Sequence, residues 1–340
     1  MKSITGGLKI FIFSCLLFLT ATAMQADTWK YALGEGLNDP QGLYATKFKE
    51  VIEQNSNHKI KIYPVGTLGE ESDIMEQVQA GLLQFVGQST GYMGGTIPEM
   101  DVFFVPYLMP DNPKHLGKFF KDSVAINKMF PKIFRKHNLE LLGMFPEGEQ
   151  AVTTMKEFHS PADLKGKKIR VMPGSPLLVD TYKAFGASPV PMSWGDLIGS
   201  LKTHMVDGQE NPTIWIAAYG LDKLTKVLTY MGHNQFTATA VANEKFFNSL
   251  SAKDKKLVKH ASAVALNYIL KEAQDLDALG LGRIIRSNPT YKIVTLTKKE
   301  RAVFKKRASK VEDAFIKEAG KSGAAILKQM KIDLKNAETK

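Results

Sequence analysis

Cysteine is almost absent from this sequence, whose 340 residues include only one, Cys15. It lies inside an apolar run at residues 10–19 that has the features of a signal peptide, so we expect the mature chain to contain no cysteine. This excludes disulfides and cysteine-ligated metal from the mature protein. A lipid anchor does not fit either, because a lipid-anchored cysteine should follow the apolar run, whereas here the run continues beyond it.

Long apolar runs are also missing. A membrane-spanning helix needs about 20 apolar residues, and the longest run occupies residues 10–19. Lysines precede this run and small residues follow it, which is the layout of a secretory signal peptide. We therefore predict a signal peptide over residues 1–26, cleaved near Ala23 or Ala26, and export of the mature chain to the periplasm.

The sequence lacks the local signatures of common enzymes. It contains no GxSxG, no HExxH, no phosphate-binding loop and no GxGxxG after a strand. Its seven histidines are scattered without a close pair at metal-ligand spacing. We expect no catalytic residue, no metal and no cofactor, and predict that the protein is not an enzyme. A periplasmic enzyme acting on a small acid is the alternative, because many enzymes have no local signature.

Acidic residues are outnumbered by basic ones. Lysine and arginine total 45 against 34 aspartates and glutamates, which gives a formal net charge of +11. Such an excess can indicate binding to nucleic acid or to an anionic membrane. Here the lysines are spread along amphipathic segments of the C-terminal third, so solvated helix faces explain the charge better. We expect no nucleic-acid partner.

Strand and helix patterns alternate along the chain, which predicts α/β layers with a largely parallel sheet. The length suits two domains better than one core. The expected strands are residues 29–33, 59–63, 84–88, 139–145, 150–155 and 168–172, with helices at 43–52, 70–80 and 176–185.

A long periodic stretch without proline occupies residues 252–286. It exceeds the length of an ordinary globular helix. We predict that it forms a long helix that braces the two domains.

Three motifs follow one another between residues 162 and 212: DLKGKKIRVMPGSP, FGASPVPMSWGDL and VDGQENP. Upstream lies IYPVGTLGEESDIMEQVQAG. In this order the set resembles the substrate-binding component of tripartite ATP-independent periplasmic (TRAP) transporters, the DctP-type family. The resemblance extends over nearly the whole mature chain. An ABC-type binding protein is the alternative within the same functional class.

The resemblance implies a two-lobed periplasmic binding protein fold with a ligand cleft between the lobes. Lobe I would comprise residues 27–148 and about 237–251, and lobe II residues 149–236 with part of 252–340, which also supplies the bracing helices. Such a protein, expected to be a monomer, captures a small organic acid and delivers it to the membrane permease subunits.

The same resemblance implies the ligand contacts. Arg170 would clamp the ligand carboxylate, since a planar guanidinium can bind a carboxylate through two parallel hydrogen bonds. Asn211 would bond to the same carboxylate, although an asparagine there could also cap a helix. Trp194 would form a flat apolar wall, and Phe236 matches a second aromatic wall more loosely.

Other positions depart from the family pattern. Gln150 stands where a second arginine is common, and Gln88 stands where the sialic-acid-binding branch has an acid. Near the first strand the polar contact falls at Gly34 or Glu35. One fixed cation with neutral amides disfavours a dicarboxylate, because a second buried anion would stay unpaired. We expect a monocarboxylate, a sulfonate, or a zwitterion whose amine meets Glu35.

Overall fold

The computed structural model describes residues 28–273 and 275–339. The predicted signal peptide lies outside these ranges. Within them, no helix is both long enough and apolar enough to cross a membrane.

One mixed sheet of nine strands forms the centre of the described part of the chain. The strand order is β2-β1-β3-β8-β4-β7-β5-β6, with β9 also paired to β8. The strands are β1 (Thr28–Leu33), β2 (Lys59–Tyr63), β3 (Phe85–Ser89), β4 (Leu139–Thr154), β5 (Lys168–Val171), β6 (Ser188–Pro191), β7 (Gly208–Asn211), β8 (Val227–Asn243) and β9 (Lys292–Thr295).

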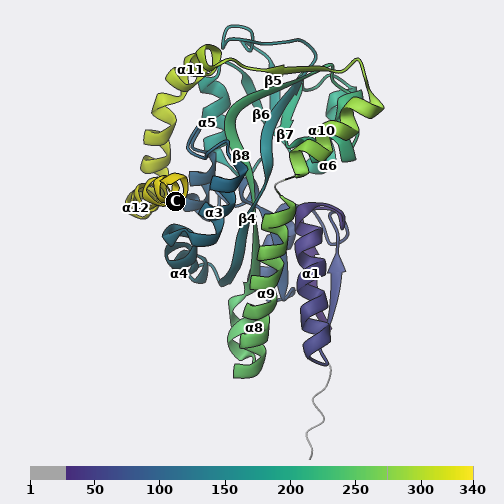
Figure 1. The fold of residues 1–340 in the computed structure, drawn as a ribbon, viewed down its shortest axis with the longest axis vertical. Helices are drawn as coiled ribbons and strands as arrows, with labels where there is room; N and C mark the ends of the chain where they lie inside the picture. The colour runs from purple at the N-terminus through teal and green to yellow at the C-terminus, as the bar shows by residue number, and fades with distance from the viewer. Residues whose placement is uncertain (1–27, 274, 340) are drawn as a thin grey trace, which may run out of the picture.

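Two long antiparallel strands, β4 and β8, run through both halves of the molecule (Figure 1). The C-terminal part of β8 pairs with β3, whereas its N-terminal part pairs with β9. The C-terminal part of β4 pairs with β7. We call the half around β1, β2 and β3 the first lobe, and the half around β5, β6 and β7 the second lobe.

The central pairings correct two expectations. The outer pairs are parallel, but β3–β8, β4–β7 and β4–β8 are antiparallel, so the sheet is mixed rather than largely parallel. The expected strands at 139–145 and 150–155 are one strand. Its register to β8 shifts around Gly148 and Glu149, and such bulges bend a strand without ending it. The predicted lobe boundary at residue 148 falls beside these shifts and stays a prediction.

Helices surround the sheet in both lobes (Figure 1). The expected helices at 43–52, 70–80 and 176–185 correspond to α1, α2 and α5. The helices are α1 (Pro40–Asn55), α2 (Glu71–Gln79), α3 (Pro113–Asp122), α4 (Phe130–Arg135), α5 (Pro176–Ala184), α6 (Trp194–Lys202), α7 (Thr213–Ala218), α8 (Glu244–Ser249), α9 (Ala252–Glu272), α10 (Leu276–Ser287), α11 (Lys298–Arg307) and α12 (Val311–Thr339), with the short helices η1 (Thr90–Tyr92) and η2 (Pro98–Phe104).

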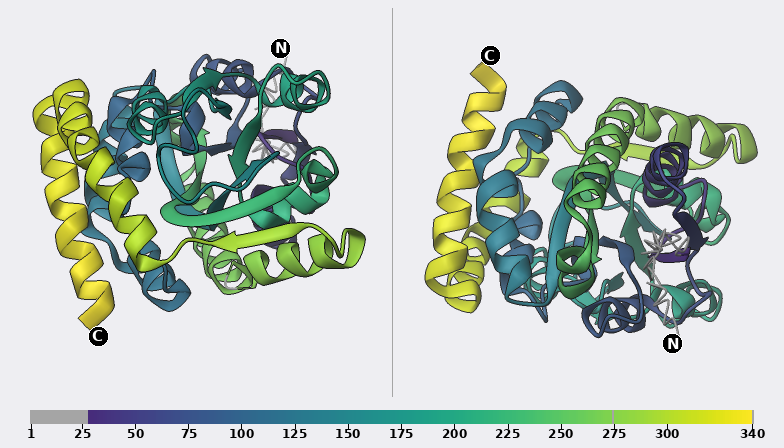
Figure 2. Two further views of the ribbon diagram at one scale, coloured as in Figure 1. Left: turned by 90° about the horizontal axis from the view of Figure 1, so that it is seen from above. Right: turned by 90° about the horizontal axis from the view of Figure 1, so that it is seen from below.

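The prediction of one long helix over residues 252–286 is wrong. This stretch contains two helices: α9 packs on α1 and β4 in the first lobe, and α10 packs on α7 in the second. The helix that contacts both lobes along one side of the molecule is α12, which packs on α3, η2 and α5 (Figure 2). It is kinked at Gly320, whose φ of 61° is readily adopted by glycine.

Candidate ligand-binding site

A cavity of about 270 Å³ lies between the two lobes. The first lobe contributes the loop after β1, the start of α2, the end of β3 and η1, and the second lobe contributes β5, α6, β7, α7 and the middle of β8. The lining residues are Gly34, Glu35, Glu71, Ser89, Tyr92, Arg170, Met172, Trp194, Asn211, Trp215 and Phe236.

Arg170 is the cation of this cavity. It lies in β5 and is only 1% exposed. Its Nε donates a hydrogen bond to the Met192 carbonyl at 3.0 Å, and its Nη2 donates to the Tyr92 hydroxyl at 3.0 Å. Among the described residues, the arginines that form ion pairs are Arg135 and Arg301. A buried guanidinium without a paired carboxylate is costly, so Arg170 is a suitable partner for an anionic ligand group.

Two carboxyl groups face the same cavity from the first lobe. Glu35 is buried, and its Oε2 accepts a hydrogen bond from the Gln41 backbone N–H at 3.0 Å. Burial raises the pKa of Glu35 well above its ordinary value, and the neighbouring Glu147 carboxyl raises it further. Burial also raises the pKa of Glu71, whereas the Tyr92 hydroxyl and the charge of Arg170 lower it. A ligand here meets one cation and two acids.

Aromatic side chains form the wall on the second-lobe side. Trp194 and Trp215 meet edge to face with ring centroids 5.8 Å apart, and Trp215 lies 6.4 Å from Phe236. Trp194 is the first residue of α6, which begins here because the Ser193 hydroxyl accepts a hydrogen bond from the Asp196 N–H. Such rings offer flat apolar surfaces that attract a cation over the ring face.

Most of the predicted site residues lie together in this cavity. Arg170, Trp194, Asn211, Phe236 and Glu35 all line it, and so does Gly34, so both candidate registers near the first strand reach the cavity. Their contacts with a ligand stay predictions.

Gln88 and Gln150 are not among the lining residues. The Gln88 amide donates to the Glu71 carbonyl at 2.9 Å and accepts from the Ser89 N–H at 2.9 Å. Gln150 is fully buried in β4, and its side-chain N and O have no hydrogen-bond partner among the described residues. A ligand contact by either glutamine remains untested.

Sequence reasoning missed several lining residues, namely Glu71, Ser89, Tyr92, Met172 and Trp215. Glu71 lies within the upstream motif, directly after the residue that caps α2 through a capping box of Glu70 and Asp73. Its position at a helix start in that motif is a signal that could have been used. Tyr92 and Trp215 lie in short helices without usable periodicity, so only the folded chain brings them to the cavity.

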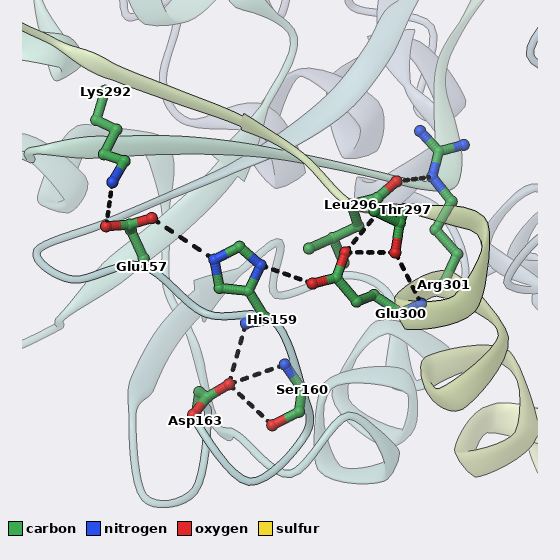
Figure 3. Close-up of polar contacts among 9 residues, drawn as sticks. All are labelled: Glu157, His159, Ser160, Asp163, Lys292, Leu296, Thr297, Glu300 and Arg301. Carbon is green, nitrogen blue, oxygen red and sulfur yellow. Dashed lines mark hydrogen bonds and ion pairs between the residues drawn. The ribbon is translucent and has the colours of Figure 1, made fainter.

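A separate polar cluster lies on the surface, where the loop after β4 meets α11 (Figure 3). The His159 ring contacts Glu157 at 3.5 Å and Glu300 at 2.8 Å. The Ser160 hydroxyl donates to Asp163 rather than to the histidine, so no nucleophile is activated by this ring. The cluster ties the C-terminal segment to the second lobe. In the described ranges, no group of three or more histidine, cysteine or acidic side chains could hold a metal ion.

Comparison with known proteins gives a consistent answer. The family model "DctP: Bacterial extracellular solute-binding protein, family 7" matches residues 33–318. The ectoine/5-hydroxyectoine-binding periplasmic protein UehA of Ruegeria pomeroyi is 50% identical over 313 residues, which cover 92% of each chain. The ectoine-binding periplasmic protein TeaA of Halomonas elongata is 43% identical over 324 residues, 95% of each chain.

A solved structure agrees with these relatives. The high-resolution structure of the periplasmic ectoine-binding protein from the TeaABC TRAP transporter of Halomonas elongata matches with a TM-score of 0.90 and 44% identity. The match covers 91% of this chain and 100% of that one. These relatives are transport proteins that bind solutes, not enzymes. The chain therefore belongs to family 7 of the bacterial extracellular solute-binding proteins and is a TRAP-type solute-binding protein.

Proposed function

We propose that this protein captures ectoine or 5-hydroxyectoine in the periplasm and delivers it to the membrane permease of a TRAP transporter. One observation carries the proposal: Arg170 from one lobe and Glu35 from the other line the same small cavity. Ectoine is a cyclic amidine with a single carboxylate, so it is a zwitterion at neutral pH. The names of the two relatives, UehA and TeaA, support the same ligand class.

The carboxylate end of the ligand would meet Arg170 and Asn211. Arg170 is held by two hydrogen bonds that use its Nε and Nη2, which fixes the plane of the guanidinium before a ligand arrives. Such preorganisation lowers the entropic cost of binding. Asn211 is the last residue of β7, and both Asn211 and Trp215 line the cavity.

The cationic end would meet Glu35. An amidinium is planar, carries its charge over two nitrogens, and can donate hydrogen bonds to a carboxylate. Trp194 and Trp215 lie across the cavity as flat surfaces for the ring, and a cation near an aromatic face gains about 0.5–2 kcal/mol. The zwitterion therefore finds Arg170 at its carboxylate end, a carboxyl that its cation can ionise at the other end, and an apolar wall at its side.

The same groups disfavour dicarboxylates. A second carboxylate would approach Glu35 or Glu71, and burying like charges together is costly. Gln88 and Gln150 lie outside the lining, so the acids rather than these amides disfavour the second carboxylate. Lactate-like monocarboxylates could use Arg170 but would leave the acids without a partner, so we expect them to bind more weakly than a zwitterion.

Titration calorimetry of the chain without residues 1–26 tests the proposal. We expect ectoine and 5-hydroxyectoine to bind with 1:1 stoichiometry and to exceed L-lactate and succinate in affinity. Stronger binding of succinate than of either zwitterion would contradict it. Uptake of labelled ectoine by cells, dependent on both this protein and a TRAP permease, would test the delivery step.

A further inference from the structure

The guanidinium of Arg170 shares the cavity with a hydroxyl group and an acid of the opposite lobe. Arg170 Nη2 donates to the Tyr92 hydroxyl at 3.0 Å, and the Tyr92 hydroxyl and the charge of Arg170 both lower the pKa of the Glu71 carboxyl, against the effect of its burial. All of these side chains line the cavity. A hydroxyl that accepts from a guanidinium is free to donate its own proton, and a carboxylate is the natural acceptor.

The fold holds Glu71 firmly at this place. Glu71 is 3% exposed and is the first residue of α2, which spans nine residues. The positive end of the helix dipole favours a carboxylate there. The Gln88 amide fixes the Glu71 carbonyl at 2.9 Å. This hydrogen bond gives Gln88 a structural role beside the cavity that Glu71 lines.

We infer that Glu71 and Tyr92 select the net charge of the ligand by positioning and partly neutralising Arg170. The inference rests on the proposed function and names residues that determine its specificity. Tyr92 occupies one N–H edge of the guanidinium, which leaves room for a single ligand carboxylate. Glu71 offsets part of the charge of Arg170, and the Glu35 carboxyl, which a nearby cation can ionise, favours a cationic group on the ligand.

A residue that sets the charge preference of the cavity can be told apart from one that only touches the ligand. A residue that only touched the ligand would, when removed, weaken every ligand that reaches it. Removing the charge of Glu71 instead makes the cavity more positive. Affinity for the net-neutral zwitterion should fall because Arg170 is less well oriented, while affinity for acids that carry net negative charge should rise.

The variants Glu71→Gln and Tyr92→Phe test the inference, with Glu76→Gln as the matched control. Glu76 lies in the same helix but is exposed, so its replacement changes the net charge equally without touching the cavity. Calorimetry with ectoine, L-lactate and succinate is performed on each purified protein. Circular dichroism confirms that the variants are folded.

We expect each of the two variants to bind ectoine roughly tenfold more weakly, the size of one hydrogen bond to a charged group. Glu71→Gln should also bind succinate more tightly than wild type does, and Glu76→Gln should change neither ligand. A uniform loss for all ligands, or an unchanged ratio of ectoine to succinate affinity, would overturn the inference. If wild type does not bind ectoine, the proposed function fails, whereas the response of succinate and lactate binding to Glu71→Gln still decides the inference.

Discussion

The two walls of the cavity differ in charge. The first lobe contributes Glu35 and Glu71, whereas the second contributes Arg170 and the aromatic side chains. Each lobe alone would attract only one end of a zwitterion. A ligand with both charges therefore gains its full interaction energy only when the lobes are together, and a ligand shifts a conformational equilibrium only by such a difference in affinity.

The lobes also meet outside the cavity, and one of these contacts adjoins the aromatic wall. The Tyr219 hydroxyl of the second lobe donates a hydrogen bond to Asp39 of the first at 3.1 Å. The Tyr219 ring stacks on Trp215 with ring centroids 5.6 Å apart, and it meets Trp194 edge to face with centroids 4.9 Å apart. Ligand contact with the tryptophans and contact between the lobes thus share one side chain.

The largest effect is expected from removing the charge of the second-lobe wall. Arg170→Ala should weaken ligand binding by roughly 30- to 5,000-fold, because losing one partner of a desolvated charge pair costs about 2–5 kcal/mol. Arg170→Lys should recover little, since an ammonium cannot form the two-pronged contact. Calorimetry with ectoine measures both, and binding by both variants within a few-fold of wild type would remove Arg170 from the site.

Removing the Glu35 charge from the first-lobe wall should cause a smaller loss of ligand affinity and should change how that affinity depends on pH. The pKa of Glu35 is raised by burial, by Glu147 and by Asp39, and that of Glu147 is raised to about 8, mainly by burial. A cationic group favours ionised Glu35, so binding should release a proton and strengthen as the pH rises.

Glu35→Gln should weaken ectoine binding about 10- to 100-fold, in line with one hydrogen bond to a charged group, and should flatten this pH profile. Calorimetry in buffers with different ionisation enthalpies counts the released protons. A wild-type affinity that falls as the pH rises would show that Glu35 does not meet a cation.

The contrast between the lobes also explains what the sequence could predict. Arg170, Trp194 and Asn211 lie in consecutive motifs of the second lobe, and motif resemblance placed them in one site. The first-lobe acids come from loops and helix starts far apart in the sequence, where spacing carries no information about proximity. Glu71 was missed although it begins a helix within the upstream motif, and Glu35 was found only to within one residue.

Elements were predicted best where the signal is local. The alternating pattern of residues 59–63 and the helix after Ser175 are confirmed as β2 and α5. The division of 252–286 into α9 and α10 was missed because both helices are apolar on one face and no proline separates them. The bulge that keeps β4 continuous depends on its pairing with β8, which a single segment does not encode.

Removing the contact between the lobes outside the cavity should change the ligand affinity less than the changes at Arg170 and Glu35. Tyr219→Phe keeps the ring that packs on the tryptophans but removes the hydrogen bond to Asp39. We expect affinity to fall by about fivefold, corresponding to ~1 kcal/mol, through a less stable closed form. Small-angle scattering should show a smaller radius of gyration for ligand-bound wild type. If ligand leaves the wild-type curve unchanged, closure is not coupled to binding and the expected effect of Tyr219→Phe has no basis.

The smallest effect should come from an acid that joins the lobes without reaching the ligand. Asp101 in η2 accepts a hydrogen bond from the Leu177 N–H at the start of α5, at 3.1 Å. Burial raises the pKa of Asp101 to about 7, against the opposing hydrogen bond from the Leu177 N–H. The folded state therefore binds a proton at Asp101 more tightly than the unfolded chain does, in which the pKa of an aspartate is about 3.9.

It follows that the proton on Asp101 stabilises the fold most at low pH, and that this contribution is lost as the pH rises from about 4 to about 7. Asp101→Asn keeps an acceptor for Leu177 but does not titrate. Relative to wild type, its melting temperature should rise across that interval and then stay level, with ~1 kcal/mol corresponding to about 2 °C. Because Asp101 lies outside the cavity lining, the pH dependence of ectoine affinity should be the same in both proteins. A flattened binding profile in Asp101→Asn would mean that the proton released on binding comes from the contact between the lobes rather than from Glu35.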